Sequence, residues 1–276
     1  MGNEWRKATL GEISLDVSYG YTESASEERV GPHFLRITDI QNGVVDWGIV
    51  PFCPISDVDH AKYRLHNGDI VVARTGNSTG ENYLFRSGED AVYASYLIRF
   101  RINRQSADAR FVWYTMRSPQ WWAFVNASKT GSAQAGANAK VLGRYPIELP
   151  PLSEQRRIAH ILGTLDEKIE LNRQMNATLE AMAQALFKSW FVDFDPVIDK
   201  ALATGNPIPE PLHKRAEARR ALGDKRRPLP AAIAQQFPSR FVFTEEMGWV
   251  PEGWGISAVD DVLDRLTITK RYKNLS

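Results

Sequence analysis

Three polar loops in the first half of the chain carry side chains that can contact nucleic-acid bases and phosphates. The first, SYGYTESAS (18–26), offers the hydroxyl groups of Tyr19, Tyr21, Thr22 and Ser24. Tyrosines on both sides of a glycine can pack on a sugar edge or a base step, and hydroxyl groups can donate hydrogen bonds to phosphate oxygens. The alternative is a polar loop whose tyrosines are anchored in the core, and the sequence does not choose between the two.

The second loop, RTGNSTGEN (74–82), directly follows a segment with the pattern of a strand. Gly76 and Gly80 let the backbone approach a phosphate closely, because a glycine has no Cβ to collide with it. The alternative is an ordinary glycine-rich hairpin turn. The candidate contact residues of this loop are Arg74, Thr75, Asn77 and Ser78.

The third loop, KTGSAQAGANAK (129–140), consists of small and polar residues. Its alanines and glycines would bring the backbone close to a ligand, and the amides of Gln134 and Asn138 can each make paired hydrogen bonds to an adenine edge. One such contact discriminates between bases by roughly 1–3 kcal/mol. Lys129 and Lys140 are candidate phosphate contacts, and a disordered surface loop is the alternative.

Motifs for catalysis are missing from the sequence. It has no G-x-x-x-x-G-K-[ST] phosphate loop, no G-x-G-x-x-G after a strand, no Asn-Pro-Pro or Asp-Pro-Pro methyltransferase motif and no [EQ]-x-K nuclease triple. Cys53, His60 and His66 match no standard zinc spacing and lack a fourth ligand. We therefore expect this chain to have no catalytic centre and to bind no metal and no cofactor.

The loops need a scaffold, and residues 1–150 have the pattern of a mixed α/β domain. Asp108 suits the cap of a short helix that Pro119 interrupts. Basic and acidic residues are nearly balanced in this region, so basic groups must be sorted onto one face if nucleic acid binds here. Runs of β-branched or aromatic residues predict strands at 33–40, 68–74, 81–86 and 91–103.

Residues 151–196 predict one long helix with an apolar face. The run from Pro150 to Trp190 corresponds to roughly 55–60 Å of helix, too long to bury its stripe on a domain of ordinary size. We therefore expect it to pair with a second long helix, with Asn172 at a core position setting the register. The predicted pairing residues are Ile158, Ile161, Leu165, Ile169, Asn172, Met175, Leu179, Met182 and Leu186.

The remaining residues divide into a linker and the start of a second domain. Residues 197–247 are rich in proline and locally basic, which predicts a linker with a short helix. Residues 248–276 weakly repeat the start of the chain, because Trp254 aligns with Trp5 and apolar residues follow both at the same spacing. This pattern indicates one complete unit followed by the start of another, truncated at Ser276.

Composition restricts the compartment and the class of protein. The chain has 276 residues, of which 43% are hydrophobic and 24% charged, and a net charge of +1, values typical of a soluble globular protein. Cys53 is the one cysteine, which excludes an internal disulfide and suits a reducing cytosol. No apolar run has the length of a membrane span, and the first ten residues lack a signal-peptide core, so we expect a cytoplasmic protein.

Several motifs together resemble the specificity subunit of type I restriction–modification systems. In the first domain, SYGYTESAS (18–26), FLRITDIQ (34–41) and GDIVVARTG (68–76) are similar to recognition domains of that family. The resemblance covers nearly all of the chain. The later motifs that carry it are IELPPLSEQRRIA (147–159), LDEKIELNRQMN (165–176), LFKSWFVDFDPV (186–197), GNPIPEPL (205–212) and GWVPEGW (248–254).

The resemblance implies an α+β fold, in which a mixed α/β target-recognition domain is followed by a long α-helix that pairs as an antiparallel coiled coil. It also implies sequence-specific recognition of double-stranded DNA, with methyltransferase and restriction subunits directed to a bipartite target. Such a specificity subunit is not catalytic. S-adenosylmethionine, ATP and magnesium are expected on the partner subunits, and the helix is expected to hold two readers at a fixed separation.

One departure from the family is that the second recognition domain is only begun in this sequence. The chain is then an engineered half, a natural half or a fragment. A half with one helix can imitate the whole by forming a homodimer, whose two identical readers would recognise a palindromic bipartite target. The alternative function is a scaffold or dimerisation protein that binds no DNA and uses the helix as an interaction rod, which the balanced charge of residues 1–150 favours.

Overall fold

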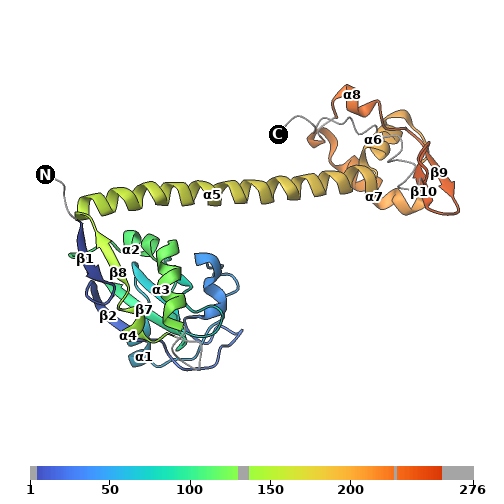
Figure 1. Cartoon of the computed structure of the whole chain (residues 1–276). Helices are drawn as coiled ribbons and strands as arrows, with labels where there is room; N and C mark the ends of the chain where they lie inside the picture. Colours follow the sequence, from blue (N-terminus) through green and yellow to red (C-terminus); the bar gives the residue numbers. More distant parts are fainter. Residues whose placement is uncertain (1–4, 130–136, 227–228, 257–276) are drawn as a thin grey trace. The chain divides into compact units, whose positions relative to one another are not determined.

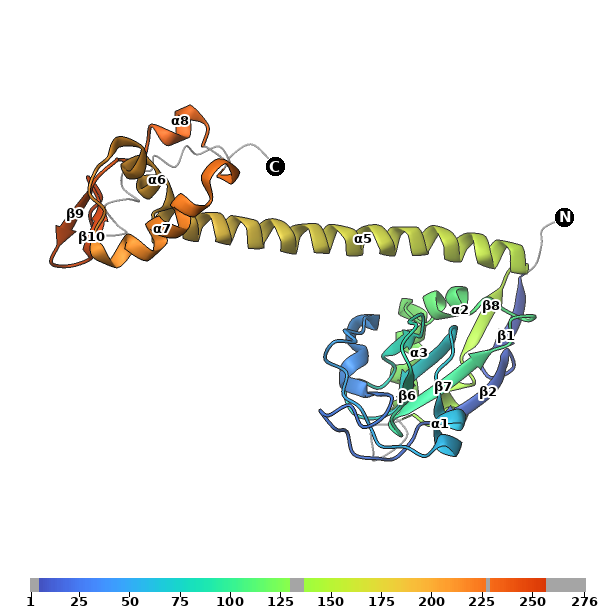
Figure 2. The same ribbon diagram turned by 180° about the vertical axis from the view of Figure 1, so that it is seen from behind.

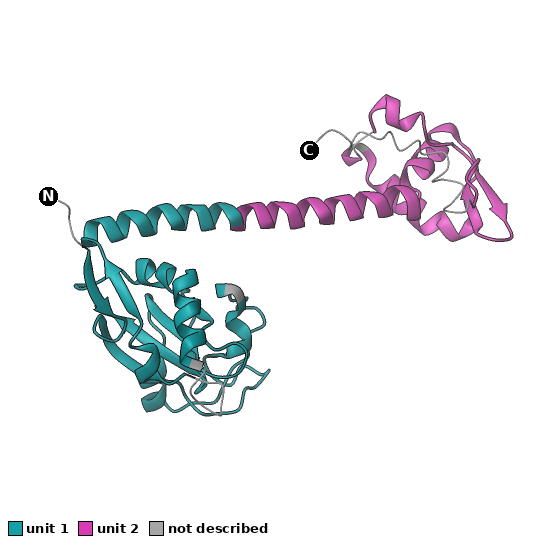
Figure 3. Ribbon diagram, in the orientation of Figure 1, with its two compact units in different colours: residues 1–169 teal, residues 170–276 magenta. Residues whose placement is uncertain are grey.

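A computed structural model describes residues 5–129, 137–226 and 229–256, with the side chains of Asn42, Lys129 and Asp224 left outside the description (Figure 1). The chain divides into two compact units, Met1–Ile169 and Glu170–Ser276 (Figure 3). The boundary falls inside a single long helix, α5, which spans Leu152–Phe187. The two units are therefore described one at a time.

The centre of the first unit is a four-stranded antiparallel sheet with the strand order β2-β7-β4-β5. All five residues of β4 are buried, because both faces of this strand are covered. Ile70 and Val72 face the cluster that includes Trp113 of α2 and Trp121 of α3, whereas Val71 and Ala73 face a second cluster on the other side. The strands of this sheet are β2 (Ser14–Tyr19), β4 (Asp69–Ala73), β5 (Asn82–Leu84) and β7 (Leu97–Ile102).

Two smaller strand pairs complete the first unit. Antiparallel β1 (Arg6–Thr9) and β8 (Pro146–Leu149) join the start of the domain to the strand that leads into α5, as both views of the chain show (Figures 1 and 2). Parallel β3 (His33–Leu35) and β6 (Ala91–Tyr93) form the other pair. The helices are η1 (Ile37–Gly43), α1 (Asp57–Tyr63), α2 (Ala109–Thr115), α3 (Pro119–Lys129) and α4 (Ala139–Leu142).

The run at 91–103 is two strands rather than the single strand that its composition predicts. Residues Ala94 to Tyr96 form a turn, after which the chain leaves the β3 pair and enters the central sheet. The break follows from pairing partners distant in sequence, which residue preference alone does not report. By contrast, the helix capped by Asp108 and interrupted before Pro119 is confirmed, since the Asp108 carboxylate accepts hydrogen bonds from two N–H groups of α2.

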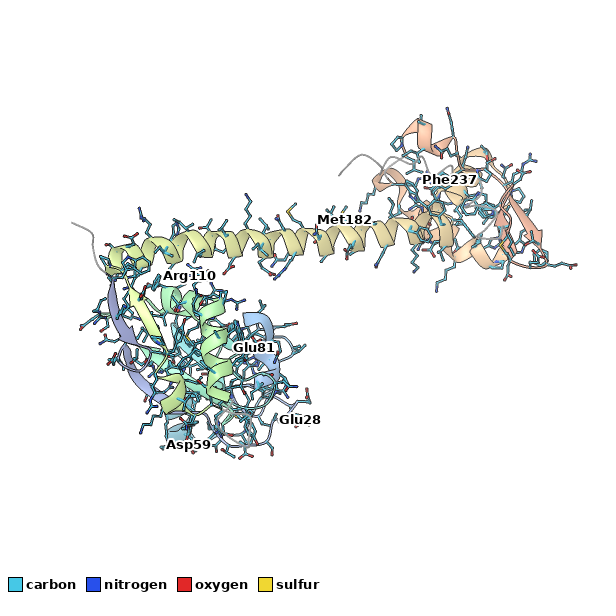
Figure 4. All side chains as sticks on the ribbon, in the orientation of Figure 1. Glu28, Asp59, Glu81, Arg110, Met182 and Phe237 are labelled. Carbon is cyan, nitrogen blue, oxygen red and sulfur yellow. The ribbon has the colours of Figure 1, made fainter. Side chains whose placement is uncertain are left out.

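The predicted long helix is confirmed, because α5 runs for 36 residues without a break, a length of about 54 Å. Only Gln155, Ala159 and Gly163 are buried along it. These lie in the first turns, where the helix packs against its own domain. Large apolar side chains at the later stripe positions are exposed, for example Met175 and Met182, which is labelled in Figure 4.

In the second unit, the residues after α5 fold into short helices tied together by ion pairs. Asp195 is buried at the start of α6, and its carboxylate accepts two hydrogen bonds from Arg215 of α7, at 2.7 and 2.6 Å. Burial alone would raise the pKa of Asp195, but hydrogen bonds from Arg215 and Ser189 lower it below its usual value. Arg219 of α7 pairs with Asp199 of α6 in the same way.

The elements of this unit after α5 are short. The segment at 197–247, for which a linker with a short helix was expected, contains most of α6, the whole of α7 and the strand β9. The elements are η2 (Lys188–Val192), α6 (Asp195–Thr204), η3 (Glu210–Leu212), α7 (His213–Ala221), η4 (Gly223–Lys225), α8 (Ala231–Ala234), β9 (Phe241–Thr244) and β10 (Gly248–Pro251). The pair β9 and β10 is antiparallel.

Candidate nucleic-acid interface

The three polar loops of the sequence converge at one edge of the central sheet. Tyr19 ends β2, and its hydroxyl oxygen accepts a hydrogen bond from the backbone N–H of Ala139 at 3.0 Å. Arg74 follows β4, and its carbonyl oxygen accepts a hydrogen bond from the N–H of Ala137, also at 3.0 Å. These two contacts join the first two loops to the end of the third. We call this surface the loop edge, and it comprises Tyr19, Arg74, Asn77, Ser78, Tyr96, Asn138 and Lys140.

Arg74 lies between two exposed tyrosines at the loop edge. Its Cζ is 5.0 Å from the ring centroid of Tyr19 and 5.9 Å from that of Tyr96. Its Nε donates to the carbonyl oxygen of Ser95 at 3.0 Å, which holds the guanidinium in place, and its terminal nitrogens have no hydrogen-bond partner among the described residues. An oriented guanidinium flanked by aromatic faces can contact a phosphate or stack on a base.

Tyr96 is not among the contact residues predicted from the sequence, because residues 91–103 have the composition of one continuous strand and the turn that contains Tyr96 is not predicted. Ala94 and Ser95 are the signal that was available, since two small residues in succession interrupt an otherwise bulky run. Tyr96 is 56% exposed, compared with 42% for Tyr19. Its place beside Arg74 makes it a stronger candidate for nucleic-acid contact than the buried aromatics of the domain.

The turn after β4 is held by its own hydroxyl groups. Thr79 is buried and its Oγ1 donates to the carbonyl oxygen of Gly76 at 2.7 Å, while Ser78 accepts a hydrogen bond from Gln41 at 3.2 Å. Gly76 has a φ of +68°, a conformation that favours glycine. Asn77 is exposed at the tip of this turn. The loop is therefore a hydrogen-bonded turn that exposes the Asn77 amide to solvent.

Not every predicted contact residue joins the loop edge. Tyr21 is half-buried and packs on Tyr63, with ring centroids 5.2 Å apart, in a small cluster with Phe34 and Cys53. This placement matches the core-anchor interpretation of that tyrosine. Thr22 and Ser24 are exposed, and Thr75 is half-buried beside Arg74.

The third loop is described only at its two ends. Gln134 and the side chain of Lys129 lie outside the described residues, so their role stays a prediction. Asn138 is exposed, and its Oδ1 accepts a hydrogen bond from the N–H of Val141 at 2.9 Å, which caps α4. Since this cap uses the acceptor of the amide, the Nδ2 group is what Asn138 offers to a ligand. Lys140, two residues further on, is exposed.

At the opposite end of the domain, α2 is fastened to the first turns of α5. The buried Gln155 accepts a hydrogen bond from the N–H of Asp108 at 2.9 Å and donates to the carbonyl oxygen of Pro150 at 2.8 Å. The Tyr114 hydroxyl donates to Asp166 at 2.7 Å. Burial raises the pKa of Tyr114 to about 12, and the neighbouring Asp166 carboxylate adds to the shift.

Gly163, the one glycine of α5, explains how Arg110 fits against the helix. A Cβ at Gly163 would lie 2.5 Å from Cζ of Arg110, so any other residue at this position would force the guanidinium to move from its place. Arg110 then reaches Glu167, with 3.2 Å between Nη2 and Oε1. We call this set of contacts the α5 junction, and it comprises Asp108, Arg110, Tyr114, Gln155, Gly163, Asp166 and Glu167.

The apolar stripe of α5 divides between the domain and solvent. Ile158 packs against the domain core, next to the buried Ala159. Beyond it, exposure is 55% at Ile161 and 57% at Leu179, so these side chains have no cover in the described structure. The other exposed stripe positions are Leu165, Ile169, Asn172, Met175, Met182 and Leu186.

The described residues contain no group of three or more His, Cys, Asp and Glu side chains placed to hold a metal ion. His60 instead pairs with Asp90, at 2.9 Å. Burial raises the pKa of the Cys53 thiol to about 11. Over the same part of the chain, no helix combines the length and the apolar character needed to cross a membrane.

Comparison with known proteins places this architecture in a family. Residues 3–181 match the type I restriction modification DNA specificity domain. The HindI specificity subunit of Haemophilus influenzae is 28% identical over 94% of this chain and 60% of its own length. The EcoKI specificity subunit of Escherichia coli is 25% identical over 66% of this chain and 42% of its own length. The chain thus spans about half the length of these curated relatives.

Solved structures give a weaker likeness. The crystal structure of the HsdS subunit from Thermoanaerobacter tengcongensis matches 68% of this chain and 49% of its own, with 20% sequence identity and a TM-score of 0.48. The type I system S subunit from M. genitalium matches the same share of this chain at 16% identity, covers 46% of its own length and has a TM-score of 0.48.

Proposed function

Since the chain belongs to the type I restriction–modification DNA specificity family, we propose that it reads one half of a bipartite target in duplex DNA with its loop edge. The observation that carries this proposal is that three loops, distant in sequence, are joined beside Arg74, whose guanidinium is oriented by the Ser95 carbonyl oxygen and the Tyr19 ring. Arg74 and Lys140 supply positive charge, Asn77 and Asn138 supply amides, and the two tyrosines supply aromatic faces.

The chain itself contributes specificity rather than catalysis in this proposal. Methyltransferase subunits bring S-adenosylmethionine, and a restriction subunit brings ATP, magnesium, translocation and cleavage. All of these act in the cytoplasm on DNA that the chain has selected. The α5 junction supports this role, because it fastens the reading domain to the first turns of the helix through Gln155, Asp166 and Glu167.

Sequence selection tests the reading function. The full chain, purified with the methyltransferase subunits encoded in its own genome, is incubated with a random-sequence duplex library and the bound DNA is sequenced. We expect an enriched bipartite motif that disappears in the double variant Arg74→Ala, Tyr96→Ala. The matched control Arg157→Ala, Phe243→Ala removes an exposed arginine and an exposed aromatic side chain that do not belong to the loop edge, and it should retain the motif. Binding without any enriched motif would contradict the proposal and favour the scaffold alternative.

A second copy of this chain is the proposed cover of the α5 stripe. Seven large apolar side chains stay exposed at the predicted pairing positions, and burying each one contributes roughly 1.5–3 kcal/mol before the costs of association. Asn172, also exposed, would lie at a core position of the pair and can select one register. Two identical readers would then face a palindromic bipartite target.

Light scattering after size exclusion tests the pairing. We expect the wild-type chain to have twice the mass of one 31.2 kDa chain. Met175→Glu, Leu179→Glu should shift it to the single-chain mass, because charges would be buried in the pair. Gln174→Glu, Ala177→Glu adds the same charge on the other side of the same turns and should leave the mass unchanged. A monomeric wild type would contradict pairing without affecting the loop-edge proposal.

A further inference from the structure

A cavity lined by arginines lies in the first unit, beside the α5 junction. Its volume is about 610 Å³, and it opens between the start of β4, the first turn of α2 and the first turn of α5. Arg110 stands at this place, between the domain and α5 (Figure 4). The four guanidinium groups that line the cavity belong to Arg86, Arg104, Arg110 and Arg156.

The charge of these arginines is largely uncompensated. Arg86, Arg104 and Arg156 form no ion pair within the described residues. Arg86 lies over the ring of Trp113, 5.4 Å from its centroid, and Arg104 donates to the carbonyl oxygen of Asn67 at 2.7 Å. Both partners are uncharged. The side chains are therefore held in place without losing their positive charge.

The fourth arginine and the one acid in the lining reduce the positive charge of the cavity without cancelling it. Arg110 shares its charge with Glu167, while its buried Nε has no hydrogen-bond acceptor in the described structure. Asp108 supplies one carboxylate against the four guanidinium groups, and this carboxylate accepts the hydrogen bonds of two N–H groups of α2. A concave site with this excess of guanidinium groups is suited to an oxyanion, which guanidinium groups bind with paired hydrogen bonds.

The loop edge itself is short of cations. Arg74 and Lys140 are the cationic residues among those that define it, and three exposed acids lie in the adjoining first loop or directly after it, Glu23, Glu27 and Glu28. Affinity for duplex DNA rests mainly on cations that neutralise backbone phosphates. A reading domain with this loop edge therefore needs phosphate contacts at another place on its surface.

We propose that the arginine cavity is that second place and holds a backbone phosphate of the DNA that the loop edge reads. This inference rests on the proposed function. Gly68 at the cavity and Arg74 at the loop edge flank the same strand, so about 20 Å of extended chain separates them. At 3.4 Å per base pair, the phosphate lies about six base pairs from the bases that are read.

Salt dependence of binding separates this site from the loop edge. The full-length variant Arg86→Gln, Arg156→Gln is titrated with a random-sequence duplex of about 30 base pairs, long enough to reach both places, at increasing salt. We expect affinity to fall about 5- to 20-fold at moderate salt and the slope of log K against log salt to become shallower by about 1 to 2. The motif enriched from a library should stay the same, because phosphate contacts carry no sequence information.

The matched control is Arg157→Gln, Arg173→Gln, which removes two arginines of α5 that pair with glutamates on the same helix. It should leave the slope and the affinity close to those of the wild type. Thermal unfolding of both variants shows whether either change disturbs folding. Removing the flanking base pairs on one side of the enriched motif should reproduce the loss seen in the cavity variant.

Three outcomes overturn the phosphate site. The first is a cavity variant with the slope and affinity of the wild type. The second is an equal loss in the control variant, which would indicate general charge rather than this cavity. The third is unchanged DNA binding with lost association of methyltransferase subunits, which would assign the cavity to an acidic protein surface. Binding of the wild-type chain without any enriched motif would overturn the proposed function instead, so the two failures are distinguishable.

Discussion

The loop edge and the α5 junction lie at opposite ends of one domain and use their polar side chains in opposite ways. At the α5 junction, the side chains of Gln155, Tyr114 and Arg110 form hydrogen bonds with other parts of the protein. At the loop edge, Arg74 and Tyr96 are positioned by few contacts and keep their outer surfaces exposed. The difference separates residues that hold a reading surface in place from residues available to a ligand.

The largest loss of stability is expected from removing the buried amide of Gln155 at the α5 junction. Gln155→Ala leaves the Asp108 N–H and the Pro150 carbonyl oxygen without partners, so we expect the free energy of unfolding of the first unit to fall by about 2–4 kcal/mol. Urea denaturation measures this change. Gln174→Ala on the exposed part of α5 is the control and should cost little, and an equally small loss for Gln155→Ala would show that the junction is not what holds the domain.

At the loop edge, a substitution should weaken DNA binding and leave stability nearly unchanged. Arg74→Ala should weaken binding to the selected duplex by about 10-fold, equivalent to about 1.4 kcal/mol, because it removes a cation and the group that orients Tyr19 and Tyr96. Its unfolding free energy should change by less than about 1 kcal/mol, since the cation–π contacts are exposed. Fluorescence anisotropy and urea denaturation measure the two quantities. A large stability loss with unchanged binding would reverse the assignment of the two regions.

The pH dependence of stability tests the role of Tyr114 at the α5 junction. Its pKa is raised to about 12 in the folded chain, so its contribution to stability is present below the pKa of an unfolded tyrosine, near 10, and is lost as pH rises toward 12. Tyr114→Phe should lower the unfolding free energy by about 1 kcal/mol at neutral pH and make the decline between about pH 10 and 12 less steep. Identical alkaline profiles for the two proteins would contradict this role.

The smallest effect is expected from an exposed ion pair near the junction. Arg157 and Glu154 lie 3.1 Å apart on the surface of α5, with 71% and 41% of their side chains exposed. Arg157→Gln should change the unfolding free energy by less than about 0.5 kcal/mol, because water screens such pairs. A loss comparable to that of Gln155→Ala would mean that exposed charge, rather than the buried amide, holds the helix to the domain.

Local patterns were sufficient for the elements with strong periodicity or clear end signals. The stripe from Ile158 to Leu186 predicted α5, and the Asp108 cap with Pro119 predicted α2 and its end. The same reasoning failed at 91–103, where two strands with different partners read as one. A strand boundary set by distant pairing leaves little trace in the residues next to it, and Tyr96 was overlooked for that reason.

Family membership followed from motifs along the chain, because such motifs are strings of neighbouring residues that the sequence contains in full. The three candidate loops were also visible, as runs of polar and small residues. Their meeting point was not, because Tyr19, Arg74 and Ala139 are joined by hydrogen bonds between residues far apart in the chain.

The balanced charge of residues 1–150 illustrates most directly what sequence composition cannot report. Composition reports the sum of charges, whereas a phosphate responds to their local arrangement. Many acids of the domain form helix caps and ion pairs, as Asp108 and Asp69 do, and within the described part of the chain Arg86, Arg104 and Arg156 have no carboxylate partner. The sequence by itself determined the long helix α5, the capped start of α2 and the family to which the chain belongs. Which side chains stay free to act was decided only when the fold paired the others.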